Sequence, residues 1–349
     1  MLPRSGLFLF VMLISVASAS ILSHSLVGLL RIKAEPVFVR QFGTRDRQDS
    51  RFVHGSSLAF DGLDWNRIAR EFDFQLHNWS SLGSSPCEWE VLQQRTPAAN
   101  SGFVVVSMYD LNEYWLSDFR ADIVPIGRAL ADLRASPADW AETKRVLSQY
   151  PMAALRRLFP TAGRSDGVMV GIRAKIQHSF ASVKANGITA SGATATGTRP
   201  ELSESITDWD PARFQRRLSG LRSTIRGKHG FDGAKRHALM RLLQSTSAKG
   251  YVCVIVLPVS QSYHAHLLTE ADRRSFEELL AFIAKEAPNV PVVRIDRSPS
   301  LLTDSLYYDL VHLNAAGQSI ATELLMGFLR SRRAAMSSSP MEPFITFGK

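Results

Sequence analysis

The sequence predicts an α/β fold: a five-stranded parallel sheet between two layers of helices, in the flavodoxin-like three-layer α/β/α arrangement, with a helical insertion. Two observations predict it. Short apolar runs bounded by polar turns alternate with amphipathic segments, as in parallel sheets with right-handed crossovers. Residues 102–107 and 251–257 are almost continuously apolar, which is typical of strands that are buried on both faces.

The first half of the sheet is expected from three short runs. They cover residues 51–54, 72–79 and 102–107, and each ends in a polar loop, as at the ligand-binding edge of open α/β sheets. A helix is expected over 58–72, because apolar residues recur there at helical spacing: Leu58, Leu63, Ile68 and Phe72. Ser57 then lies at a strand-to-helix turn.

The second half of the sheet follows a long helical insertion at about 125–230. Helical segments there are separated by Pro137, Pro151 and Pro160, and 186–200 is rich in small residues, which indicates a loop. After it we expect these elements in order: a helix at 233–248, a strand at 251–257, an amphipathic helix at 270–286, a strand at 290–295 and a helical pattern over 320–329. One domain that includes the insertion is expected over 51–330, with a tail at 331–349.

Composition and charge fit a folded protein with an anionic neighbour. The 349 residues include 45% hydrophobic and 21% charged residues, so most of the chain should fold, and the formal net charge is +9. This charge favours membrane headgroups or an acidic polymer over nucleic acid, because no aromatic-basic nucleic-acid motif is present. A merely basic soluble surface is the alternative. The insertion carries much of this charge: Arg156, Arg157, Arg164, Arg173, Lys175, Arg213, Arg216, Arg217, Arg222 and Arg226.

The N-terminal segment is expected to direct the chain to a membrane or across it. Residues 7–30 are mostly apolar and long enough to span a bilayer, which takes about 20 apolar residues. An uncleaved anchor is favoured over a cleaved signal peptide with small residues at 16–19, because the apolar character resumes at Ile21. Residues 1–34 are thus the expected anchor or signal peptide, and 35–50 the connector.

Two cysteines are too few for a disulfide framework or a cysteine-based zinc site. Cys253 lies in an apolar run and should be buried, whereas Cys87 follows Pro86 in an expected loop and could be exposed. The sequence leaves open whether Cys87 and Cys253 form a single disulfide. His264 and His266 lack an obvious third metal ligand, so neither a metal nor another cofactor is expected.

A candidate catalytic set joins the two ends of the domain. Asp309 precedes His312 by three residues and can orient it as a general base. Ser57 is the candidate nucleophile, and the backbone N–H groups of Ser57 and Gly83 are candidates for the oxyanion hole. This set predicts acyl transfer through an acyl-serine. His54, next to the turn, is expected to pack or hydrogen-bond beneath it, and Trp79 and Tyr114 are either a sugar subsite or core.

These motifs resemble those of the SGNH (GDSL-like) hydrolase superfamily. Residues 55–58 resemble its first block in a Gly-Ser-Ser form, 78–83 its second, and 309–312 its last. The long insertion and the sequence around 307–314 look most like membrane-anchored bacterial envelope members, including relatives of alginate O-acetylation proteins and of a D-alanyl-lipoteichoic acid biosynthesis protein.

The third block departs from the family pattern. The resemblance implies Gly-x-Asn-Asp, but residues 107–110 read Ser-Met-Tyr-Asp, so the oxyanion-hole asparagine is missing in register. Asp110 retains the last position of the block and lies at the expected substrate edge. Asn112 could take the place of the missing asparagine, or it could only cap the loop.

The resemblance implies a serine esterase or O-acyltransferase acting on O-acyl groups, with acetyl favoured, of a cell-envelope or exported polysaccharide. It implies an anchored domain facing the periplasm or exterior, or a secreted one if the signal is cleaved, with a membrane-bound acyltransferase as a possible partner. The alternatives are a non-catalytic carbohydrate-binding or assembly protein on the same fold, and an anchored protein without a glycan role.

Overall fold

The computed structural model describes residues 12, 14–23, 25, 40–42, 49–81, 83–95, 100–113, 121, 123–134, 140–158, 210–225 and 229–338. The chain divides into two compact units: Met1–Pro36 with Arg145–Arg199, and Val37–Lys144 with Pro200–Lys349. In the first unit, residues 14–23 and α8 (Gln149–Leu158) are helical. The sheet and the candidate site belong to the second unit.

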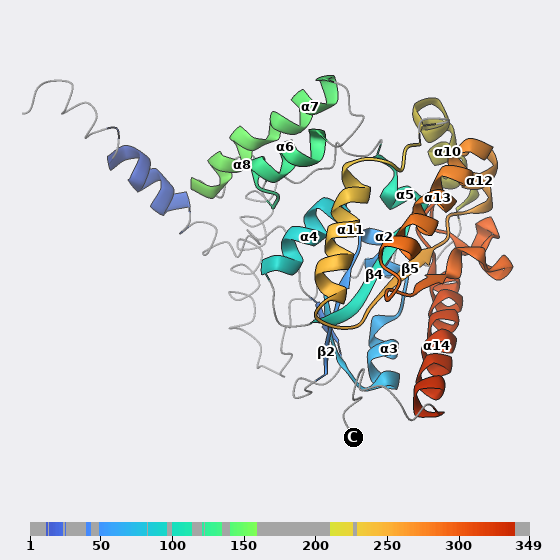
Figure 1. Ribbon diagram of the computed structural model, residues 1–349. Helices are drawn as coiled ribbons and strands as arrows, with labels where there is room; N and C mark the ends of the chain where they lie inside the picture. The colour runs from blue at the N-terminus through green and yellow to red at the C-terminus, as the bar shows by residue number, and fades with distance from the viewer. Residues whose placement is uncertain are drawn as a thin grey trace, which may run out of the picture. The chain divides into compact units, whose positions relative to one another are not determined.

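Six strands form one sheet in the order β1-β3-β2-β4-β5-β6 (Figure 1). Their bounds are β1 (Arg40–Phe42), β2 (Ser50–His54), β3 (Gln75–Asn78), β4 (Ser101–Ser107), β5 (Val252–Leu257) and β6 (Val292–Arg294). The last five strands of this order are parallel, which confirms the predicted sheet, and their order is the flavodoxin-like one. The antiparallel edge strand β1 was not predicted, and it lies within the expected connector.

The sheet lies between two helix layers, as predicted (Figure 1). On one side α4 (Pro86–Arg95) packs on α11 (Ala234–Ser247), and α13 (Glu270–Glu286) also contacts α11. On the other side α3 (Trp65–Phe72) and α14 (Ala315–Ser338) are joined by ion pairs, Arg67 with Glu323 and Arg330 with Glu71. All six residues of β5 are buried, as its continuous apolar run predicted.

Two predicted elements near the site need correction. The helix expected over 58–72 is two helices, α2 (Ser57–Asp61) and α3, because Gly62 caps the end of α2 and the Asp64 side chain caps the start of α3 by accepting from Arg67 N. The strand expected from residue 72 begins later, at Gln75, because Asp73 takes a left-handed conformation at the end of α3.

Cys87 lies in α4, which was not predicted, and it is fully buried rather than in an exposed loop. Cys253 is buried as expected, and both cysteines are free thiols. The strong turn composition before Pro86 hid the helix, although proline is well suited to the first turn of a helix.

The insertion is helical where the structure describes it. It contains α6 (Ile126–Arg134), α7 (Trp140–Leu147), α8 and α10 (Pro211–Ile225). Pro151 was expected to break a helix but lies in the first turn of α8, where no intrahelical N–H bond is lost. Pro137, Pro160 and residues 186–200 lie outside the described residues.

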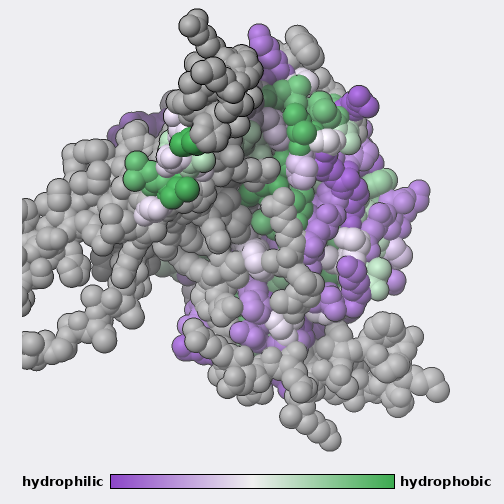
Figure 2. Space-filling model, turned by 90° about the vertical axis from the view of Figure 1, so that its left-hand side faces the viewer, coloured by the Kyte–Doolittle hydropathy of each residue, from purple (hydrophilic) through white to green (hydrophobic). Residues whose placement is uncertain are grey.

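The surface of α10 is basic, and that of α6 is partly apolar. Buried Phe214 and Leu218 leave Arg216 and Arg217 exposed on α10, while Ile126 and Leu130 of α6 are among the exposed large apolar side chains. Figure 2 shows apolar side chains gathered on one part of the face it presents and hydrophilic ones along its flank. Whether the basic residues bind an anionic polymer stays a prediction.

Candidate active site

The turn between β2 and α2 presents Ser57. Ser56 is the N-cap of α2, and its hydroxyl accepts a hydrogen bond from Leu58 N at 3.1 Å. Ser57 is half-buried as the first residue of the helix. Gly55 is required by close approach, because a Cβ there would lie 2.2 Å from Ala59 Cβ and 3.1 Å from Val105 O. The turn therefore packs on β4 while leaving one hydroxyl accessible.

The structure brings Ser57, His312 and Asp309 together in one chain of hydrogen bonds. Ser57 Oγ lies 2.8 Å from His312 Nε2, and His312 Nδ1 lies 3.0 Å from both carboxylate oxygens of Asp309. Asp309 Oδ1 also accepts from the backbone N–H groups of Val311 and His312 at 2.9 and 2.8 Å. The carboxylate is thus fixed by its own loop, and it holds the Nδ1 side of the imidazole.

The loop that carries His312 is closed at both ends. Tyr308 N donates to His312 O at 2.8 Å, and an isolated bridge joins Tyr307 to Leu313. Asn314 then caps α14, since its Oδ1 accepts from Ala316 N and Gly317 N at 3.1 Å each. The Asn-Ala-Ala-Gly sequence after the histidine therefore begins a helix, as predicted, and fixes where the imidazole stands.

The charges around His312 favour its protonated form. Burial alone would lower the pKa of His312, but the hydrogen bond and charge of Asp309, with the nearby carboxylates of Asp110 and Asp61, raise this pKa above its ordinary value. Burial opposes ionisation of Asp309, yet its bonds with His312 and with the Val311 backbone hold its pKa below the usual range. The pair is therefore arranged to stabilise an imidazolium.

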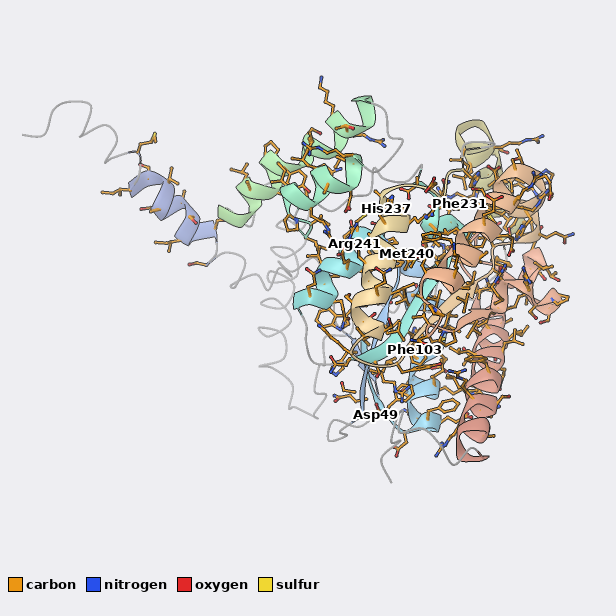
Figure 3. The ribbon with its side chains drawn as sticks, viewed as in Figure 1. Asp49, Phe103, Phe231, His237, Met240 and Arg241 are labelled. Carbon is orange, nitrogen blue, oxygen red and sulfur yellow. The ribbon has the colours of Figure 1, made fainter. Side chains whose placement is uncertain are left out.

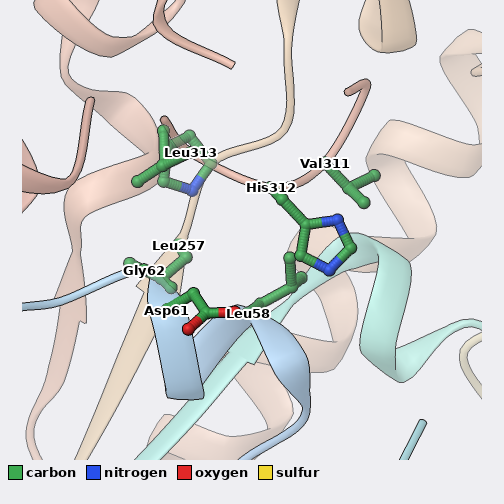
Figure 4. A pocket seen from close by; sticks show the side chains of 8 residues that line it. Leu58, Asp61, Gly62, Leu257, Val311, His312 and Leu313 are labelled. Atoms are coloured by element: carbon green, nitrogen blue, oxygen red, sulfur yellow. The ribbon is translucent and has the colours of Figure 1, made fainter. Parts of the chain in front are cut away.

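A small hollow opens beside the imidazole (Figure 4). It is lined by Leu58, Asp61, Gly62, Leu257, Pro258, Val311, His312 and Leu313. Most of these side chains are apolar, and Asp61 is the one carboxylate among them. The hollow joins residues from α2, the end of β5 and the His312 loop, so the hydroxyl end of α2 and the imidazole share one rim of the sheet.

Gly83 lies in a loop that is anchored on the Ser57 turn. Gly55 O accepts from Ser81 N at 3.2 Å and from Ser84 Oγ at 2.8 Å. Gly83 itself is exposed and has φ +67°, a conformation that favours glycine. The Gly83 loop is therefore placed against the Ser57 turn. Binding of an oxyanion by Gly83 N stays a prediction.

Asp110 and Asn112 follow β4 but face different surroundings. The Asp110 carboxyl accepts from Ser107 Oγ at 2.9 Å and lies near the Ser56 hydroxyl, beside Ser57. Burial raises the pKa of Asp110, and these two hydroxyls and nearby Lys235 act in the opposite direction. Asp110 thus lies within the site, but against the protein's own hydroxyl groups.

Asn112 is fully buried, and its Oδ1 accepts from Gly230 N at 3.1 Å. It also ends the short helix α5 (Met108–Leu111), with its backbone N–H directed at Tyr109 O. This environment favours the alternative of a loop-capping asparagine over direct contact with a substrate. Asn112 therefore does not supply an exposed amide in place of the asparagine that residues 107–110 lack.

The other aromatic and imidazole residues have varied surroundings. His54 is fully buried, its Nε2 lies 2.7 Å from Gln93 Oε1, and burial lowers its pKa to about 4 despite that hydrogen bond. His264 and His266 lie in α12 (Gln261–His266), and Trp79 packs partly buried against the core. Tyr114 lies outside the described residues.

In the described part of the chain, no group of three or more His, Cys, Asp or Glu residues is placed to hold a metal ion.

Sequence reasoning missed Lys235, whose ammonium group donates to the backbone carbonyls of Asp110 and Asn112. A signal for its burial was present, because Lys235 recurs with Leu239, Leu242 and Thr246 at helical spacing on the buried face of α11. Its contact across 125 positions of the chain could not be read from that spacing.

Comparison with known proteins finds no family model that matches this sequence and no curated protein that matches it. Among the described helices, none is both long and apolar enough to cross a membrane. Much of the expected anchor, residues 7–30, lies outside the described residues.

Proposed function

We propose that this protein is a serine esterase or O-acyltransferase that acts on O-acyl groups, acetyl above all, of a cell-envelope or exported polysaccharide. The observation that carries the proposal is the hydrogen-bonded chain from Ser57 Oγ through His312 to the Asp309 carboxylate. A hydroxyl, an imidazole and an orienting carboxylate in this geometry are the parts that covalent acyl transfer needs.

In the first step Ser57 Oγ attacks the carbonyl carbon of the ester while His312 Nε2 takes the hydroxyl proton. Asp309 stabilises the imidazolium that forms, and its own proton affinity is kept low by its bonds with the loop backbone. When the tetrahedral intermediate collapses, the carbon–oxygen bond to the sugar breaks and His312 protonates the departing oxygen. An acyl-Ser57 ester remains.

In the second step a water molecule or a sugar hydroxyl attacks the acyl carbon while His312 removes its proton. The bond from the acyl carbon to Ser57 Oγ then breaks, and His312 returns the proton to Ser57 Oγ. Water gives an esterase, and a sugar hydroxyl gives a transferase. The hollow beside His312 is lined mainly by apolar side chains, among them Leu58 and Leu257. Ser57 N, at the start of α2, is one donor for the oxyanion, and Gly83 N is a candidate for a second.

The polysaccharide and its location rest on the motif resemblance and on the chain's charge. The net charge of +9 and the exposed arginines of α10 are compatible with an anionic glycan, and the apolar segment at 7–30 is compatible with an envelope location. A membrane-bound acyltransferase that supplies acyl groups is the partner that a transferase of this kind would need.

A non-catalytic glycan-binding or assembly protein is the second candidate. The altered third block favours it, because Asn112 is buried against Gly230 and does not supply an exposed amide. Loss of one oxyanion donor typically costs about 10²–10³ in rate. A protein of this kind would bind polysaccharide with the triad geometry intact but would not turn it over.

The two candidates are separated by measuring acetate release from an O-acetylated polysaccharide, and acetyl transfer to the same polysaccharide after deacetylation. An enzyme gives turnover that is lost in Ser57→Ala and His312→Gln but kept in Ser300→Ala, an exposed serine outside the site. Binding without turnover, equal in all four proteins, would support the non-catalytic candidate and contradict the proposed enzyme.

A further inference from the structure

Lys235 is a buried lysine in the first turn of α11. Its side chain belongs to a residue that is only 2% exposed, and Nζ donates to Asp110 O at 2.9 Å and to Asn112 O at 2.7 Å. A cation at a helix N-terminus is unfavourable with respect to the helix dipole, and a buried ammonium group loses its hydration. Burial accordingly lowers the pKa of Lys235, against the charges of Glu113 and Asp110.

The loop after β4 and the start of α11 hold each other. Glu113 Oε1 accepts from Lys235 N and Arg236 N at 2.9 and 3.3 Å, and so serves as the cap that Gly233, the N-cap residue, cannot provide with a side chain. Glu113 N donates to Gly230 O at 2.8 Å. These bonds join the third-block loop to the segment where the chain returns from its insertion.

The same loop continues to the nucleophile. Asp110 lies between the two ends of this connection: its carbonyl accepts from Lys235, and its carboxyl accepts from Ser107 Oγ and lies near the Ser56 hydroxyl. Ser56 is the N-cap of the helix that begins with Ser57. A path of contacts therefore runs from the Lys235 ammonium through Asp110 to the turn that carries Ser57.

We propose that Lys235 is a positioning residue for the Ser57 nucleophile: it fixes the Asp110–Asn112 backbone so that the Asp110 carboxyl supports Ser56 and thereby the Ser57 turn. The proposal deepens the proposed function and rests on it for its catalytic consequence. The start of α11, where the chain returns from the insertion, thus supports the site without contacting substrate. Lys235 belongs to none of the motif segments at residues 55–58, 78–83 and 309–312.

Arg241 provides a matched control on the same helix (Figure 3). Its guanidinium pairs with Glu90 at 2.9 Å and Asp132 at 2.7 Å, both of which are nearly buried. Arg241→Met therefore removes a second, more exposed cation from α11, one whose partners lie on α4 and α6. A purely structural role of Lys235 predicts similar consequences for the two substitutions.

The test compares Lys235→Met with Arg241→Met in the full chain. Hydrogen–deuterium exchange of residues 55–61 should accelerate in Lys235→Met and match wild type in Arg241→Met. For p-nitrophenyl acetate, kcat should fall about tenfold or more in Lys235→Met with KM within about twofold, because a misplaced nucleophile slows the chemical step. Unchanged exchange at 55–61 in folded Lys235→Met would overturn the proposal.

Asp110→Asn extends the test if Lys235→Met does not fold. It keeps the shape of the side chain while removing the charge that faces Ser56, and faster exchange of residues 55–61 is again expected. Exchange at the wild-type rate would overturn the proposal. An inactive wild type would contradict the proposed enzyme alone, because the exchange measurement needs no turnover and still decides whether Lys235 supports the turn.

Discussion

Ser57 Oγ and His312 Nε2 lie 2.8 Å apart although the two residues are separated by 255 positions in the chain. The fold accounts for this meeting. Ser57 follows β2, the sheet places β2 beside β4, and the His312 loop packs over the end of β5 at Leu257 and Pro258. The strand order reverses between β2 and β4, which is the position where open α/β sheets bind their ligands.

The Asp309→Asn substitution tests how the imidazole is held. The asparagine cannot supply the charge that raises the pKa of His312, and it can also favour the wrong tautomer of the ring. We expect kcat for p-nitrophenyl acetate to fall by a factor on the order of 10⁴, as expected for a triad carboxylate. Activity close to wild type would show that Asp309 does not orient the base.

The pH dependence of activity follows from the same pair. His312 acts as a base only when neutral, and its pKa is raised above its ordinary value by Asp309. The kcat/KM of wild type should therefore rise with pH through an apparent pKa above about 6.5, the unperturbed histidine value. In Asp309→Asn this apparent pKa should be lower, so the residual activity should increase with pH over a more acidic range than in wild type. A profile that stays flat between pH 5 and 8 would contradict His312 as the base.

The Asp309–His312 pair also makes the free energy of unfolding depend on pH. Asp309 has a lowered pKa when folded, so its contribution is present above about pH 4 and is lost as the pH falls through the folded pKa. His312 has a raised pKa, so its contribution is present below about pH 6.5 and is lost as the pH rises through the folded pKa. We expect Asp309→Asn to be most destabilising, relative to wild type, between about pH 4 and 6.5 in urea unfolding. A destabilisation that grew from pH 7 to 9 would contradict this assignment.

His54 should make the protein sensitive to acid. Its pKa is lowered to about 4 by burial, so the unfolded chain binds a proton that the folded protein excludes. Between pH 6.5 and 4 this difference should remove about 3 kcal/mol from the free energy of unfolding. Urea unfolding of His54→Gln should show a correspondingly smaller loss over that interval. Equal slopes for the two proteins would show that His54 is not the responsible group.

Gly55 should resist substitution for a steric reason. In Gly55→Ala the new methyl group would overlap Ala59 and press on the Val105 carbonyl, so we expect a loss of about 1–3 kcal/mol in the free energy of unfolding. Gly127→Ala is the matched control, because no atom lies within 4 Å of a Cβ there and the residue is in α6. It should be neutral or stabilising by about 0.5–1 kcal/mol. A Gly55→Ala variant as stable as wild type would contradict the close packing of the turn.

The sequence predicted the parts of the fold that depend on local patterns. The apolar run at 251–257 became β5, and the helix expected over 270–286 is α13, whose Thr269 and Asp272 form a capping box. The break between α2 and α3 was missed because the apolar spacing continues across Gly62. The α4 helix was missed because a serine-rich turn precedes it.

The site was predictable only in part, for a related reason. Motif residues Ser57, Asp309 and His312 could be recognised singly, and their order along the chain indicated one edge of the sheet. Lys235 and Gly230 could not, because their bonds with the Asp110–Glu113 loop depend on where the chain returns from the insertion. No local pattern encodes that return path, so only three-dimensional contacts show it.

Covalent labelling of the serine hydroxyl tests whether Ser57 is an activated nucleophile. The full chain is treated with a serine-directed fluorophosphonate, and the adduct is located by mass spectrometry of peptides. We predict one adduct, on Ser57, absent from Ser57→Ala, strongly slowed in His312→Gln, and still on Ser57 in Ser56→Ala. No adduct on the folded wild-type protein, or an adduct that persists in Ser57→Ala, would contradict the account.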